Sequence, residues 1–329
     1  MSNFEKRDHF FDFIKAFAIF LVLNDHFVGY FAEQYHQTVP FLQLFGIFYG
    51  KFGVSLFAII SGYFAYLSGK KGTDAYAYVV KRYLFFFFSC LITNVLYYLF
   101  NVNDVRSASS VGMIVGETIT LGDYFCPSFW FIRDFFLGCI ISFKMGRADT
   151  KLADSLIITF IAYVYGFTFI ASVITGTILY HILTKDNGFL TRSSIKIGLL
   201  IIFAYSAFYR IENTAIRYTS NAIRALAFIL FIYKNRLISF LSDRRITAIL
   251  GSKTLAILTA HFLMIHCFLG LDLSVPLFVK YILWFIASVI ISVPIDYLVR
   301  ILCSFFSEKA IKIIQRMKSN DKLVSLFKQ

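Results

Sequence analysis

The chain alternates long apolar runs with short polar segments, and the lengths of these runs predict the elements that they form. About 20 apolar residues are enough for one helix to cross the hydrocarbon core of a bilayer. The runs that predict such spans lie at about 10–30, 47–67, 83–100, 127–144, 152–167, 169–184, 195–210, 219–234, 246–268 and 276–304. The pattern therefore predicts an all-α integral membrane protein with about ten transmembrane helices.

The distribution of Lys and Arg predicts the topology, because these residues favour cytoplasmic loops. The stretch from Leu152 to Leu183 could form one overlong helix or two short helices around Tyr165–Gly166–Phe167. Ten spans and a cytoplasmic N-terminus place most basic loop residues inside. A single helix in this stretch would instead move Arg236, Arg244 and Arg245 to the outside. We therefore expect two spans here, with both termini of the chain cytoplasmic.

The chain divides into two parts by composition. Residues 1–306 are interpreted as one membrane-embedded domain, and residues 307–329 as a basic cytoplasmic tail. Apolar and basic residues alternate in the tail, which fits an amphipathic helix on the anionic leaflet. The longest outer segment, Asn101 to Cys126, contains Ser and Gly and is expected to be a polar loop.

Composition supports the membrane assignment and limits the partners. Hydrophobic residues make up 58% of the chain and charged residues 16%, and the mean hydropathy is +0.71, whereas roughly half of a soluble domain is apolar. The net charge of +13 would suit nucleic acid, but the basic residues lie between apolar runs as topology signals. The lipid bilayer is the expected partner, and nucleic acid is not. The five cysteines show no CxxC spacing, so no metal site is expected.

Ionisable residues inside the first span are candidates for function, because charges are costly in a membrane. Asp12, Lys15, Asp25 and His26 all lie in this run. Lys15 and His26 are eleven residues apart, close to three helical turns, so they share one face about 16 Å apart along the axis. Asp25 points about 100° away from His26, so their adjacency implies no Asp–His pair. The alternatives are interfacial snorkelling of Lys15 and a structural interhelical hydrogen bond for His26.

Several segments resemble the membrane acyltransferase 3 family. In its first-helix signature a basic residue, usually Arg, precedes a His by ten intervening residues, and Lys15 and His26 keep that spacing in FDFIKAFAIFLVLNDHF. The other segments occur in the family's order: FGVSLFAIISGYFAY with Ser61, Gly62 and Tyr63, KRYLFFFF with Lys81 and Arg82, PSFWFIRDF with Trp130 and Phe131, and LGSKTLAILTAHF with Gly251, Thr254 and His261. Lys in place of Arg keeps the charge but loses the planar bidentate fork.

The resemblance implies an integral membrane O-acyltransferase of a bacterial inner membrane. Such an enzyme moves an acyl group, commonly acetyl, from cytoplasmic acyl-CoA to a hydroxyl of a cell-surface polysaccharide or a polyprenyl-linked sugar. His26 would be the general base, since a hydroxyl needs a positioned base to become nucleophilic. Lys15, Lys81 and Arg82 would neutralise the phosphates or the thioester side of the donor.

Three further site assignments remain open on the residues alone. Ser61 and Tyr63 would shape the tunnel and donate hydrogen bonds to the developing oxyanion. A Ser-Gly pair, however, more often permits close helix packing than it supplies a nucleophile. On the acceptor side, Trp130 would either stack on a sugar or anchor at the interface. His261 would either line the path or be a buried structural histidine.

A second function class fits the same charged span. A proton-coupled transporter or flippase of a glycan or lipid-linked intermediate would use Lys15 and His26 for coupling or binding. Transporters often carry inverted repeats with broken helices, and the sequence shows no such symmetry. A regulatory subunit that has lost activity is a third interpretation.

Overall fold

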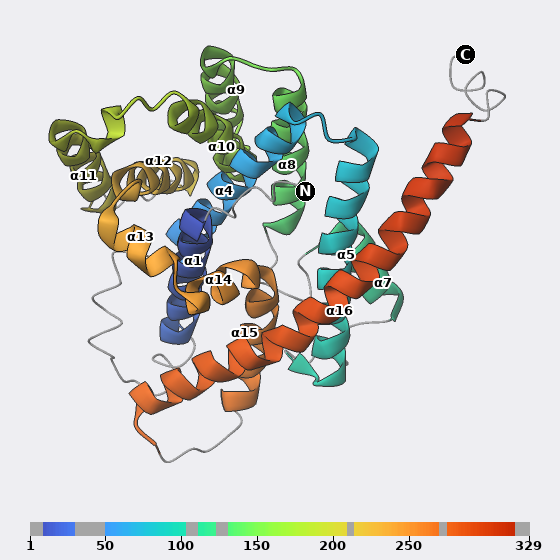
Figure 1. Cartoon of the computed structure of the whole chain (residues 1–329). Coiled ribbons are helices and arrows are strands. Elements are labelled where there is room, and N and C mark those ends of the chain that lie inside the picture. The colour runs from blue at the N-terminus through green and yellow to red at the C-terminus, as the bar shows by residue number, and fades with distance from the viewer. Residues whose placement is uncertain are drawn as a thin grey trace.

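The computed structural model describes residues 9–29, 50–102, 111–122, 131–208, 214–269 and 275–319. Every regular element in these ranges is a helix, which confirms the all-α class for the described part of the chain (Figure 1). In chain order they are α1 (His9–Phe27), α4 (Gly50–Lys70), α5 (Ala75–Leu99), α7 (Val111–Thr120), α8 (Ile132–Arg147), α9 (Leu152–Val164), α10 (Thr168–Thr184), η5 (Phe189–Thr191), α11 (Ser193–Phe208), α12 (Thr214–Ile232), α13 (Arg236–Ser242), α14 (Arg245–Ser252), α15 (Thr254–Leu269) and α16 (Leu277–Ser319).

The ambiguous stretch after residue 151 forms two helices, as the charge bias predicted. Helix α9 ends at Val164, and α10 begins at Thr168. Gly166 has φ of +80°, a left-handed conformation that glycine adopts without steric cost. The turn lets α10 pack back against α9.

One predicted span and one predicted loop differ from the structure. The run at 246–268 is not one straight helix, because α14 and α15 meet at an angle of 77°. The predicted span at 219–234 agrees with α12, which ends at Ile232. Helix α13 then leaves at an angle of 96°, where Lys234 has φ of +56° and the Asn235 side chain caps α13. The segment after Asn101, which was expected to be a polar loop, contains the short helix α7. Ile114 of α7 packs against Tyr98 of α5 and so connects the two helices.

The lengths and composition of the described helices bear on the number of membrane spans. Three described helices are long and apolar enough to cross a membrane, Lys51–Lys70, Ala75–Leu99 and Leu277–Arg316, and the two bent pairs would raise this number to five. The other apolar helices are shorter, and α1 carries several charges within 19 residues. The structure therefore supports a multi-pass membrane protein, and the count of ten stays a prediction.

Helix α4 lies at the centre of the bundle, where it packs against α1, α8, α10 and α12. Its closest approach is to α10, at Gly62 and Gly176. A Cβ at Gly62 would collide with the carbonyl oxygen of Val173, and one at Gly176 with that of Ile59. Small residues allow membrane helices to pack this closely, so the Gly of the Ser-Gly pair has a packing role.

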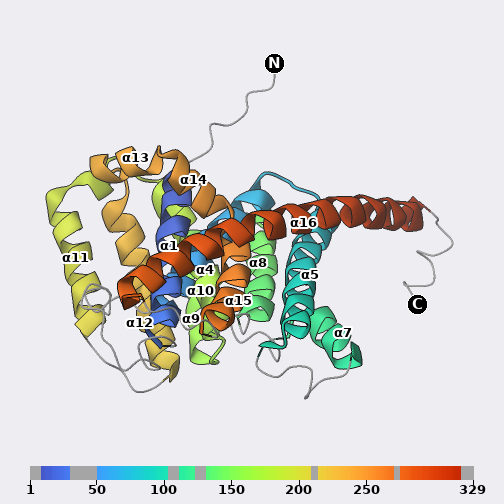
Figure 2. The same cartoon turned by 90° about the horizontal axis from the view of Figure 1, so that it is seen from below.

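Several basic connections lie at one end of the bundle, where ion pairs join them. Lys70 forms a 2.5 Å ion pair with Asp149, and this hydrogen bond holds the pKa of Asp149 below its usual range. Lys234 pairs with Asp186 at 2.9 Å. These contacts join connections that are far apart in the sequence. Figure 2 shows α13 and α14 at this same end, above the upright α1.

Helix α16 runs across the other helices, in contact with α15 and α5 (Figures 1 and 2). It continues without a break through residue 306 to Ser319. The predicted boundary between membrane domain and tail therefore falls inside one helix.

Candidate functional site

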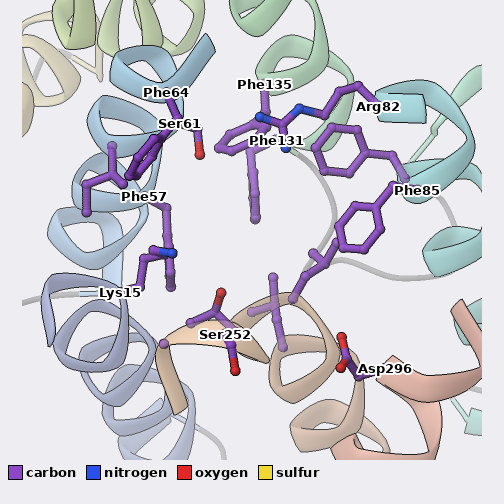
Figure 3. Close-up of a pocket in the computed structure, with 16 residues that line it drawn as sticks. Lys15, Phe57, Ser61, Phe64, Arg82, Phe85, Phe131, Phe135, Ser252 and Asp296 are labelled. Atoms are coloured by element: carbon purple, nitrogen blue, oxygen red, sulfur yellow. The ribbon is translucent and has the colours of Figure 1, made fainter. Parts of the chain in front are cut away.

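A cavity of about 350 Å³ opens at the basic end of the bundle (Figure 3). Helices α1, α4, α5, α8, α14, α15 and α16 all contribute to its wall. Its lining is mainly aromatic with a few polar groups: Lys15, Phe57, Ile60, Ser61, Phe64, Arg82, Phe85, Phe86, Phe131, Phe135, Gly251, Ser252, Thr254, Leu255, Leu258 and Asp296. Apolar walls with a few placed polar groups are typical of ligand sites.

Lys15 reaches the cavity from α1. Its ammonium lies 3.2 Å from Asp12 Oδ1, one turn earlier on the same helix, and 5.8 Å from the centre of the Phe64 ring. Asp12 is buried. Gly251 brings the backbone of α14 against that of Asp12, since a Cβ there would collide with the Asp12 carbonyl oxygen. The cation is thus held at the cavity wall rather than at an open interface.

Arg82 enters the cavity from the wall opposite Lys15, as Figure 3 shows. Its guanidinium lies 5.8 Å from the ring centres of both Tyr78 and Phe86 on its own helix. Ser61 of α4 also lines the cavity. Two cations facing each other across an aromatic cavity suit a ligand with negative charge and an apolar portion.

His26 lies at the other end of α1, where it meets His261 of α15. Nδ1 of His26 and Nε2 of His261 are 2.7 Å apart and share a hydrogen bond. The two rings are nearly parallel, at 5° and with centres 4.9 Å apart, and Phe262 packs edge-on against both. In such a hydrogen bond one nitrogen donates its proton and the other accepts through its lone pair. The contact therefore requires an unprotonated nitrogen on one of the two rings.

Helix α16 braces this pair from outside. Trp284 is fully buried and donates from Nε1 to the carbonyl oxygen of His261, at 3.1 Å. Tyr281 donates from its hydroxyl to Oδ1 of Asn24, at 2.5 Å. Asn24 is two residues from His26 on α1. Both helices that carry the histidines are therefore fixed to α16.

The structure brings some predicted site residues together and separates others. Lys15, Ser61 and Arg82 line one cavity, and His26 contacts His261. Tyr63 does not line the cavity and packs instead among rings that include Tyr180. Lys81 is exposed on α5, and Trp130 lies outside the described residues.

Sequence reasoning missed an ion cluster at the edge of the cavity. Oδ2 of Asp296 accepts hydrogen bonds from Lys253 Nζ and from Arg300 Nε, each at 2.8 Å. Asp296 lines the cavity and lies on α16, in a run predicted to span the membrane. An ionisable residue inside a span is a signal of function, and it could have drawn attention to Asp296.

Comparison with known families identifies the family of this chain. The acyltransferase 3 family model, described as an acyltransferase domain, matches residues 8–300. The chain belongs to the acyltransferase 3 family. No curated protein and no solved structure matches it in the corresponding comparisons. Family membership confirms the family resemblance found in the sequence and supports a membrane acyltransferase activity. In this acyltransferase 3 protein the matched region contains both the cavity and the histidine pair.

Proposed function

We propose that this protein is an O-acyltransferase that moves an acyl group, commonly acetyl, from acyl-CoA to a hydroxyl of a cell-surface or lipid-linked glycan. One observation carries the proposal: a cation-lined cavity and a hydrogen-bonded histidine pair lie at opposite ends of the same helix, α1. An enzyme that receives its donor and acceptor from opposite sides of a membrane needs sites separated in this way. The end with the basic connections would face the cytoplasm, in a bacterial inner membrane.

His26 is the general base of this proposal. It would take the proton of the acceptor hydroxyl as the oxygen attacks the thioester carbonyl, and the C–S bond would then break to release the CoA thiolate, which takes up the proton. His261 would accept a hydrogen bond from Nδ1 of His26, which leaves Nε2 of His26 to act as the base. His261 is thus a positioning residue, supported by its 2.7 Å contact with His26.

The cavity would hold the donor. Lys15 and Arg82 supply positive charge from opposite walls, and the aromatic side chains between them suit the apolar stretches of a pantetheine arm. Leu258 of the lining precedes His261 by about one turn on α15. The arm would therefore extend from the cavity along α15 toward the histidines.

Purified protein, labelled acetyl-CoA and a crude glycan or polyprenyl-linked acceptor provide the test. We expect transfer of label by the wild type and its loss in His26→Ala. His266→Ala is the matched control, because His266 lies on α15 five residues beyond His261, and the described structure gives it no contact with His26. Transfer that survives His26→Ala would exclude the general-base role. Movement of glycan across vesicles without any label transfer would favour the transporter or flippase.

A further inference from the structure

The ion cluster of Lys253, Asp296 and Arg300 lies where the cavity meets the basic end of the bundle. We infer that Lys253 and Arg300 bind the 3′-phosphate of coenzyme A, with Asp296 holding both cations in place before the donor arrives. The inference rests on the proposed function, because it assigns a further contact to the same donor.

The geometry keeps both cations beside the cavity. Asp296 lines it directly and accepts a hydrogen bond from each cation at 2.8 Å. Lys253 lies between Ser252 and Thr254, which both line the cavity. Arg300 also donates from Nη2 to the Ser252 carbonyl oxygen, at 3.1 Å. Figure 3 shows Asp296 and Ser252 on the same side of the cavity.

The cations retain donors for a second anion. An arginine has five N–H donors and a lysine three. The described hydrogen bonds of Arg300 use one donor on Asp296 and one on Ser252, and that of Lys253 uses one on Asp296. The Arg300 side chain is 55% exposed, whereas that of Asp296 is 8% exposed. The Asp296 carboxylate is therefore buried, whereas the Arg300 side chain is accessible to a ligand.

The charge balance favours an anion here. Two cations share a single carboxylate, so the cluster carries an excess positive charge at the cavity edge. Arg82 adds another cation on the wall, while Lys15 is matched by Asp12. A phosphate monoester carries close to two negative charges, and Arg favours phosphate through its planar fork.

The size and place of the cavity indicate which end of the donor lies beside the cluster. A space of about 350 Å³ suits the pantetheine arm of coenzyme A, while the adenosine 3′-phosphate is at the opposite end of the molecule from the thioester. With the arm directed toward the histidines, the nucleotide stays at the mouth. The exposed Arg300 then lies at the nucleotide end of the donor.

The test measures equilibrium binding of coenzyme A and of 3′-dephospho-coenzyme A to the full chain in phosphatidylcholine nanodiscs. The probes differ only in the 3′-phosphate, so lipid phosphate cannot produce a difference between them. We expect the wild type to bind coenzyme A about tenfold more tightly, equivalent to about 1.4 kcal/mol. Lys253→Met and Arg300→Met should each remove most of that preference and leave the affinity for the dephospho probe unchanged.

Two variants control for folding and for general charge. Arg300→Lys keeps the positive charge and the ion pair with Asp296 but loses the planar guanidinium, so it should retain part of the preference for coenzyme A. This variant provides the test if Arg300→Met does not fold. Lys309→Met removes an exposed cation farther along α16 and should keep the full preference. A parallel fall in the affinity for both probes would overturn the inference in favour of a structural cluster. Equal wild-type affinity for both probes would overturn the inference alone, and binding of neither would also reject the proposed donor.

Discussion

The two halves of α1 differ in what surrounds them, although they belong to one helix of 19 residues. The half around Lys15 borders a cavity, where charge is paired with Asp12 and faces a second cation on α5. The half around His26 is packed against aromatic rings and meets another imidazole. Charges are costly in a membrane interior unless they are paired or line a cavity, whereas an imidazole can be neutral.

This difference indicates a division of labour along the helix. Under the proposed function, the Lys15 half would attract the charged donor, and the His26 half would move a proton at a fixed point. Eleven residues, or about 16 Å of helix, separate the two. A single helix can fix this separation more firmly than a loop could, because its backbone hydrogen bonds are all internal.

The strongest test of this division is His26→Gln, which keeps the polar character of the side chain but removes the base. We expect kcat for acyl transfer to fall by about 10² to 10⁴, the usual contribution of general base catalysis. The affinity for coenzyme A should stay within about twofold, because the donor site is at the other half of the helix. Transfer kinetics and binding measured on one preparation check both parts. A matching loss of donor affinity would contradict the division.

The next largest effect is expected from the histidine partner. His261→Leu removes the hydrogen bond to His26, and we expect kcat to fall about tenfold to a hundredfold through misorientation of the base, with an unchanged KM for acyl-CoA. His261→Gln, which retains hydrogen-bonding groups, should recover part of the rate. If the two variants lose the same activity, His261 acts through packing and not through its hydrogen bond.

At the cavity half, the expected effect is on donor affinity. Lys15→Met should weaken the binding of acyl-CoA about tenfold with little change in kcat, since a charge-assisted hydrogen bond contributes about 1.5–3 kcal/mol. Lys15→Arg introduces the residue that the family resemblance implies is usual here, and this variant should bind the donor at least as well. Saturation kinetics with varied acyl-CoA separate KM from kcat. A pure kcat defect in Lys15→Met would place this cation in the chemical step.

The smallest effect concerns the brace between α1 and α16. Tyr281→Phe removes the hydrogen bond to Asn24 and should lower the free energy of unfolding by about 0.6 kcal/mol, the average for side-chain hydrogen bonds between membrane helices. Thermal unfolding of the purified protein measures it. Tyr297→Phe is the control, because Tyr297 is an exposed tyrosine on the same helix. An equal loss of unfolding free energy in both variants would show that the hydrogen bond between Tyr281 and Asn24 has no specific stabilising role.

Helix positions were largely accessible from the sequence. Apolar runs coincide with α1, α4 and α5, and the break at Gly166 was visible as a turn between two short runs. The bend between α14 and α15 was not visible, because Ser252 and Lys253 are compatible with a continuing helix. The Lys253 contact with Asp296, 43 residues later, becomes apparent only when α16 is in place.

The candidate site likewise has features that the sequence predicts and features that only the tertiary structure reveals. The sequence by itself determined that Lys15 and His26 share a face and how far apart they lie, because helical geometry fixes both from local spacing. Only the tertiary structure decided that His261 is the partner of His26, 235 residues away, and that Arg82 faces Lys15 across a cavity. The physical reason is that such pairs depend on which helix faces pack together, and packing is set by close contacts such as Gly62 against α10 and Gly251 against α1.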